Sequence, residues 1–259
     1  MPPKADQFDK AFGFLLGHIA TTVAGIGLRA GLFKALRRHP AGASPARLAA
    51  DLDFDTYAVE VWCRSAFAFE LLELAAGDRY RLGPHMDAIL LDRLDPAYMG
   101  GRIRSANLSH HDAEAYLGFL HSGQPVVRSE HCTELVAAVA DSSNADAPII
   151  TDEVLPQVPT AIEGLESGGS LLDLGAGAGY HLAHYADRFP GARVVGLESD
   201  TPSVAQAMTT LDAAGLSDRV DVIQANALEL AATSEFDVIT MNLVLHEVGD
   251  ASAQAEVLQ

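Results

Sequence analysis

The run LLDLGAGAGY, Leu171–Tyr180, constrains the fold of this chain more than any other segment. Ser170–Leu174 is apolar except for Asp173, and three alternating glycines follow it at once: Gly175, Gly177 and Gly179. Glycine allows the backbone to turn tightly and to approach a ligand without a Cβ clash. A helix predicted over His181–Phe189 would direct its free N–H groups and positive dipole end at that turn. The run therefore predicts a buried strand, a tight turn and a helix, although this glycine spacing alone is a weak signal.

Three more strands are predicted beyond this turn, over Arg193–Leu197, Val220–Gln224 and Phe236–Met241. The first of them ends in Glu198, about twenty residues after the glycines, where nucleotide-binding βαβ units place an acidic side chain on the ribose hydroxyls. Asn226 follows the second strand, where its amide could meet an adenine edge. These positions predict a parallel α/β sheet with a nucleotide-type ligand at its carboxyl ends.

The order and spacing of these four motifs resemble those of class I S-adenosylmethionine-dependent methyltransferases. Dinucleotide dehydrogenases share the first two elements, but their fingerprint is G-x-G-x-x-G, whereas this chain has G-x-G-x-G. The resemblance implies a Rossmann-like methyltransferase core, of which the chain supplies the first four strands, and S-adenosylmethionine as cofactor. The residues expected to bind it are Asp173, Gly175, Gly177, Gly179, Glu198, Asn226 and Asn242, with Asp173 acting either directly or through other side chains.

The amino-terminal part is predicted to be mostly helical, with helices over Phe12–Leu36, Pro45–Leu52 and Thr56–Leu74. A small β-hairpin follows around Gly77, with strands over Leu72–Ala76 and Arg79–Leu82. This winged-helix arrangement, over residues 12–90, resembles the dimerisation domain of small-molecule O-methyltransferases. Winged helices more often bind DNA, but three aspartates near the second helix and a net charge of −18 would repel phosphates.

Three regions are expected: a winged-helix dimerisation domain over residues 1–105, linker helices over 106–165, and a partial methyltransferase domain over 166–259. In the resembled family the linker lines the substrate pocket. It contains His110, His111, His121 and His131. Their spacing matches no zinc pattern, so we expect pocket-lining or solvated histidines and no metal.

His246 is the candidate catalytic residue. The resembled O-methyltransferases use a histidine followed by aspartate and tryptophan as general base, and here the tripeptide is His246-Glu247-Val248. A near-neutral imidazole suits removal of a phenolic or enolic proton. The expected function is methyl transfer to a small, hydroxyl-bearing acceptor of specialised metabolism. Three alternatives stay open: C-methylation, N-methylation, or a histidine that only packs near the cofactor.

The composition of the chain indicates the cellular compartment in which it is expected. The first ten residues, MPPKADQFDK, are too polar for a secretion signal, and no apolar run is expected to span a membrane. Two cysteines in 259 residues favour a reducing compartment. We expect a cytoplasmic protein that binds neither membrane nor nucleic acid.

The resembled domain has a seven-stranded sheet in the order 3-2-1-4-5-7-6, and only four strands are predicted here. The fourth, although it reads as buried on both faces, would form an open edge. Three explanations are open: a truncated chain, a partner chain that supplies the other strands, or a catalytically silent subunit of a split methyltransferase. A homodimer or heteromer through the amino-terminal domain is expected in each case.

Overall fold

The computed structural model describes residues 2–109, 117–118, 120–122, 133–229, 235–248 and 251–258. The chain forms two compact units, Met1–Ser142 and Ser143–Gln259.

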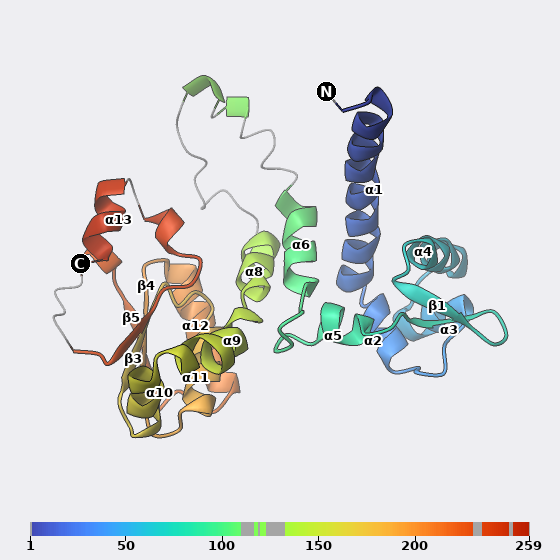
Figure 1. Ribbon diagram of the computed structural model, residues 1–259. Helices are drawn as coiled ribbons and strands as arrows, with labels where there is room; N and C mark the ends of the chain where they lie inside the picture. The colour runs from blue at the N-terminus through green and yellow to red at the C-terminus, as the bar shows by residue number, and fades with distance from the viewer. Residues whose placement is uncertain are drawn as a thin grey trace. The chain divides into compact units, whose positions relative to one another are not determined.

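The first unit is mainly helical, with one two-stranded antiparallel sheet (Figure 1). Its elements in chain order are α1 (Lys4–Arg29), α2 (Leu32–Arg37), α3 (Pro45–Leu52), α4 (Thr56–Ala68), β1 (Leu72–Ala75), β2 (Arg79–Leu82), α5 (Met86–Leu91), α6 (Gly100–Leu108) and α8 (Thr133–Ser142).

Local signals explain several of these boundaries. The Ser44 hydroxyl accepts a hydrogen bond from the Arg47 N–H at 3.2 Å and starts α3 at the predicted residue. The predicted helix over Phe12–Leu36 is wrong as one element, because Gly31 adopts a left-handed conformation (φ 73°) and separates α1 from α2. Helix α4 ends at Ala68 rather than Leu74, since Glu70 takes a positive φ of 59° and turns the chain into β1.

The core of the first unit forms where helices α2, α3 and α4 meet the β-hairpin. The Trp62 ring packs edge-on against Phe33 with 5.2 Å between ring centroids. Its indole N–H donates to the Val23 carbonyl at 3.0 Å, which satisfies the one polar atom of this side chain. A Cβ added to Gly27 would lie 2.4 Å from the Trp62 ring, so the close approach of α1 requires glycine there.

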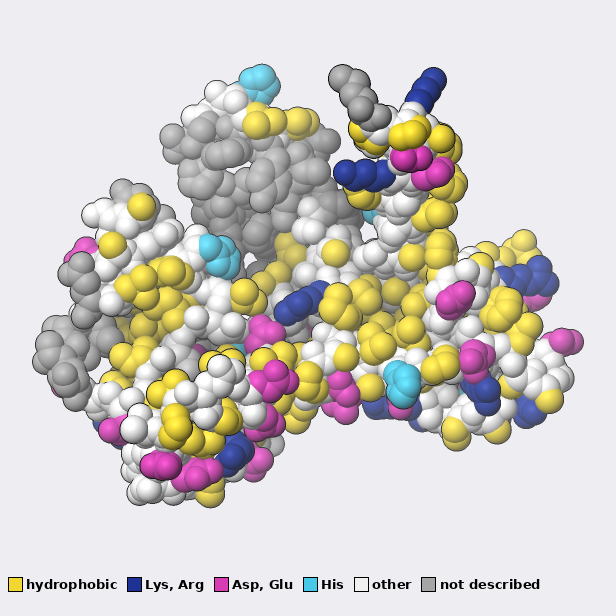
Figure 2. Space-filling view, in the orientation of Figure 1, with side chains coloured by type: hydrophobic (Ala, Val, Ile, Leu, Met, Phe, Trp, Pro, Cys, Tyr) yellow, Lys and Arg dark blue, Asp and Glu magenta, His cyan; other side chains and the backbone are white. Residues whose placement is uncertain are grey.

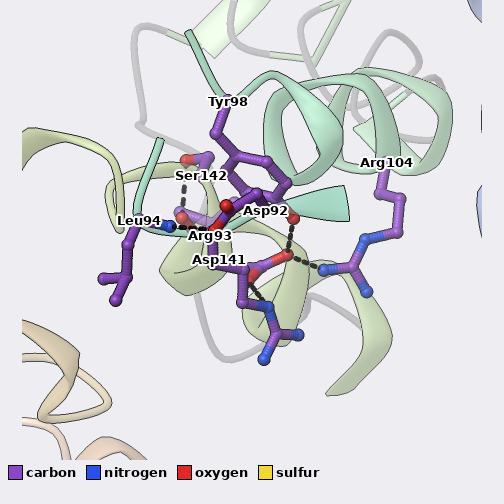
Figure 3. Close-up of polar contacts among 8 residues, drawn as sticks. Asp92, Arg93, Leu94, Tyr98, Arg104, Asp141 and Ser142 are labelled. Atoms are coloured by element: carbon purple, nitrogen blue, oxygen red, sulfur yellow. Dashed lines mark hydrogen bonds and ion pairs between the residues drawn. The ribbon is translucent and has the colours of Figure 1, made fainter. Parts of the chain in front are cut away.

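A buried carboxylate joins α8 to α6 and to the segment before α6 (Figure 3). Asp141 is 1% exposed. Its Oδ2 accepts from the Tyr98 hydroxyl at 2.7 Å and from the Arg104 guanidinium, while Arg93 Nε lies 2.6 Å from Oδ1. Burial, and then the hydrogen bond to Asp141, raise the pKa of Tyr98 to about 12, so this tyrosine stays a hydrogen-bond donor throughout the neutral range.

The expectation that no apolar run could span a membrane is wrong on length and composition. Helix α1 meets both criteria, and among the described residues no other helix does. Most of α1 is exposed, and Figure 2 shows hydrophobic side chains along it. Its exposed large apolar residues are Phe8, Phe12, Phe14, Leu15, Leu16, Ile19 and Ile26.

The second unit contains a four-stranded parallel sheet in the order β5-β4-β3-β6. Its elements are α9 (Asp146–Ile149), η3 (Ile150–Val154), η4 (Leu155–Gln157), α10 (Pro159–Glu166), β3 (Ser170–Leu174), α11 (Tyr180–Arg188), β4 (Arg193–Glu198), α12 (Thr201–Ala213), β5 (Val220–Gln224), η5 (Ala227–Glu229), β6 (Val238–Thr240), η6 (Leu245–Glu247) and α13 (Ala251–Val257). When β3 to β6 are counted as the first to fourth strands of this unit, the order is 3-2-1-4, as the sequence predicts.

Two elements of the second unit differ from the sequence predictions. Thr151–Glu166, at the end of the region expected to form linker helices, is not one continuous helix: Pro156 and Pro159 lack the N–H groups that would continue it, and a π-helical turn, a 3₁₀ turn and α10 form instead. Strand β6 was expected to be buried on both faces. Val238 and Thr240 are buried, but Ile239 is 56% exposed on this edge strand.

Candidate functional site

The sequence-predicted site residues gather at the carboxyl ends of the parallel strands. The glycine turn follows β3, and Glu198 ends the neighbouring strand β4. Asn226 follows β5, and Asn242 follows β6 on the other side of β3. In open α/β sheets this edge is where ligands bind.

The space around the three glycines of the turn differs from one position to the next. All have positive φ, at 75°, 53° and 78° in chain order. A Cβ on Gly175 would lie 2.3 Å from the Val244 side chain, and one on Gly179 would lie 3.0 Å from the Ala207 backbone in α12. Of the atoms that the structure describes, a Cβ on Gly177 would meet only the Gly175 carbonyl oxygen, at 4.0 Å. The first and third glycines thus allow close packing, and Gly177 leaves open space beside the turn.

Glu198 binds the turn directly. Its Oε2 accepts the Gly177 N–H at 2.8 Å, and its Oε1 accepts the N–H groups of Ser199 and Asp200 at 2.8 and 2.9 Å. A carboxylate offers about four acceptor positions, so about one is left for a ligand hydroxyl while these three bonds persist. Acceptance from two ribose hydroxyls, as the sequence predicts, would require the Gly177 bond to be exchanged.

Asp173 lies beneath the turn rather than on its surface. It is 2% exposed, and its Oδ1 accepts from the Thr240 hydroxyl at 2.7 Å across the β3–β6 pair. Burial raises the pKa of Asp173, the nearby His181 and the Thr240 hydrogen bond oppose this shift, and the Glu198 carboxylate increases it. This placement favours an indirect role, in which Asp173 fixes the end of β6 through Thr240.

The remaining predicted residues lie around the edge of the turn. The Asn226 Oδ1 accepts the Leu228 N–H at 3.0 Å, so this oxygen stabilises the start of η5. The Asn242 amide donates to Asp146 Oδ2 at 2.9 Å. His246 is exposed, in the short 3₁₀ turn after β6. The structure thus joins Glu198 to Gly177 directly.

The sequence predicts that Ser143–Thr151 lies within the linker helices over 106–165 and indicates no site residue in it. Three side chains of the second unit hold this segment. The Ser143 carbonyl is 2.8 Å from His181 Nε2, Asp146 binds Asn242, and the Thr151 hydroxyl is 3.0 Å from His184 Nε2. No local signal marks these pairs, since their members lie 33 to 96 residues apart in the chain.

The histidine-rich stretch of the linker falls mostly outside the described residues, which include His121 but not His110, His111 or His131. Among the residues that are described, no three His, Cys, Asp or Glu side chains are grouped so as to hold a metal ion.

One family model matches the second unit. Residues 171–259 match the family described as methyltransferase domain. This match begins one residue after the start of β3 and includes the glycine turn, Glu198 and His246. No curated protein matches the chain.

Solved structures extend the likeness to both units. An O-methyltransferase family protein from Burkholderia thailandensis matches with a TM-score of 0.69 at 20% identity, over 100% of this chain and 75% of that one. Human N-acetylserotonin methyltransferase, in complex with S-adenosylmethionine, matches with a TM-score of 0.70 at 16% identity, over 99% and 75%. Mitomycin 7-O-methyltransferase matches with a TM-score of 0.64 at 18% identity, over 98% and 76%.

The chain therefore has the class I methyltransferase fold, with a helical amino-terminal unit followed by the α/β methyltransferase domain. The resemblance drawn from the glycine turn and the strand order is confirmed. The chain spans about three quarters of the length of these solved structures.

Proposed function

We propose that this protein transfers the methyl group of S-adenosylmethionine to a hydroxyl of a small-molecule acceptor. The observation that carries this proposal is the glycine turn at the carboxyl end of β3, which the Glu198 carboxylate holds through Gly177. When bound, the cofactor supplies a methyl group on a sulfonium, which a nucleophile displaces in line.

The residues present fit this cofactor. Gly177 leaves open space beside the turn, and Glu198 keeps acceptor capacity for a ribose hydroxyl. The Glu198 carboxylate also adds negative charge to this edge of the sheet, which favours a cationic sulfonium over an anionic ligand.

His246 is proposed as the general base. It follows β6 at the edge of the sheet where the cofactor would bind, and it is exposed to an incoming acceptor. A neutral imidazole can accept the proton of a phenolic or enolic hydroxyl as the oxygen attacks the methyl group.

Loss of the Glu198 carboxylate tests the cofactor site. We expect Glu198→Ala to weaken S-adenosylmethionine binding by about 1–3 kcal/mol, the cost of hydrogen bonds to a charged group. Isothermal titration calorimetry measures the effect. Asp221→Ala, which removes an exposed carboxylate from the neighbouring strand β5, is the matched control and should bind like the wild type. Equal affinity of Glu198→Ala and the wild type would remove Glu198 from the site.

We further propose that α1 associates with a second copy of this chain in the cytoplasm. Phe14 is 69% exposed and Leu15 is 52% exposed, and they lie within a row of exposed apolar residues along α1. Among the described residues, no heavy atom lies within 4 Å of a Cβ added to Gly13 or Gly17, so another helix could approach closely there. Burial of this apolar surface would stabilise a dimer.

Light scattering after size exclusion tests this association. A dimer should have twice the 27.4 kDa mass of the chain, and Phe14→Glu should shift the protein towards the single mass. Met208→Glu, at a 61% exposed apolar residue of the second unit, should leave the mass unchanged. A wild-type protein with the single mass at every concentration would contradict the proposal.

A further inference from the structure

Helix α11 carries two histidines that the proposed chemistry does not use. His181 lies in the first turn of α11, two residues after Gly179, and His184 lies one turn further on. Both contact the segment Ser143–Thr151, which leads into the methyltransferase domain. These contacts connect α11 to the segment that precedes β3.

The segment Ser143–Thr151 is fixed against α11 by apolar burial as well as by polar contacts. Ala145, Ala147 and Pro148 are buried, and α9 packs on α11. The Asp146–Asn242 bond ties the same segment to the residues that follow β6. The segment therefore borders the carboxyl edge of the sheet beside the glycine turn.

The His181–Ser143 contact lies nearer to the glycine turn than the His184–Thr151 contact. Ser143 presents a backbone carbonyl, which can only accept, so His181 Nε2 carries the proton and donates at 2.8 Å. His181 is 8% exposed, and its ring packs edge-on against Tyr185 with 5.9 Å between centroids. Its ring is thus held on one side by Tyr185, and its N–H is committed to Ser143. His184 binds the far end of the segment, away from the turn.

We propose that His181 is a positioning residue for the methyl donor, which holds the segment Ser143–Thr151 as a fixed wall beside the glycine turn through its bond to the Ser143 carbonyl. This inference rests on the proposed function, because it assumes that S-adenosylmethionine binds at that turn. Without this bond, the segment Ser143–Thr151 would have to become ordered when S-adenosylmethionine binds, and the entropy lost in that ordering would reduce the affinity for S-adenosylmethionine.

Two substitutions separate the hydrogen bond from the packing. His181→Phe keeps a ring against Tyr185 but has no donor. His181→Gln places an amide N–H near the position of Nε2 and can donate to the carbonyl again. Thr151→Val, which removes the contact with His184 at the other end of the segment, is the matched control.

The first measurement is S-adenosylmethionine affinity by calorimetry. We expect His181→Phe to raise Kd about tenfold, as loss of one buried hydrogen bond predicts, and His181→Gln to restore most of the affinity. Thr151→Val should change Kd by less than about twofold. If His181→Phe does not fold, His181→Asn, whose amide is too short to reach Ser143, should show the same tenfold loss.

The second measurement is amide hydrogen exchange of residues 143–151 without donor, which does not depend on cofactor binding. We expect faster exchange in His181→Phe than in the wild type and in His181→Gln. Equal affinity of the wild type and His181→Phe for the donor would overturn the positioning role. A loss of affinity in Thr151→Val as large as that in His181→Phe would overturn it too. A wild type that fails to bind the donor would instead overturn the proposed function, and with it any donor-positioning role, whatever the exchange data show.

Discussion

Replacement of Asp141 by alanine should lower the free energy of unfolding of the first unit by about 3–4 kcal/mol. The substitution removes the shared acceptor of Tyr98, Arg93 and Arg104. Arg93 is half exposed and can be hydrated again, but Arg104 and the Tyr98 hydroxyl would lose their partner in a mostly buried place. A buried charge left without its counter-charge is among the most destabilising consequences of a single substitution.

Urea unfolding followed by tryptophan fluorescence measures this change selectively. Trp62 is the only tryptophan of the chain, and it lies in the core of the first unit, so its emission reports the unfolding of that unit. The matched control is Glu134→Ala on the same helix. Glu134 pairs with Arg29 at 2.7 Å, but both side chains are 48% exposed, and such pairs contribute less than about 1 kcal/mol. Equal destabilisation by the two substitutions would show that the Asp141 cluster adds no stability.

Replacement of His246 by alanine should reduce kcat by about 10²–10⁴-fold and leave S-adenosylmethionine affinity unchanged. The reason is that the acceptor hydroxyl would attack the methyl group without a base to take its proton. Transfer of a radiolabelled methyl group to a panel of phenols measures kcat, and calorimetry measures donor binding. His39→Ala, in the first unit, is the matched control and should retain full activity.

The acidity of the acceptor provides a sharper signature of this base. Nitrophenols ionise near neutral pH without help, so His246→Ala should slow their methylation much less than that of an unsubstituted phenol. An equal loss for both acceptors would indicate that His246 orients the acceptor instead. Full activity with both would exclude any role for His246 in the reaction.

The sequence predicted the centre of the second unit closely. The bounds of β3 and β5 and the end of β4 at Glu198 agree with the structure, as does the strand order. Asp55 starts α4 where its sequence position indicates, with its carboxylate on the Ala58 N–H at 2.8 Å. These features depend on apolar runs, glycines and caps within a few residues of one another, and such signals can be read along the chain.

Other features could be found only in the tertiary structure. Gly175 must be glycine because Val244 lies against it, and the sequence does not show that contact. The same holds for Asp141 with Tyr98, and for His181 with the Ser143 carbonyl, pairs that lie 43 and 38 residues apart. Whether a buried polar side chain is satisfied depends on which distant groups the fold brings within about 3 Å of it. The sequence by itself therefore determined the class of fold and brought the candidate site residues to one edge of the sheet, whereas the tertiary structure decided which distant side chains contact them.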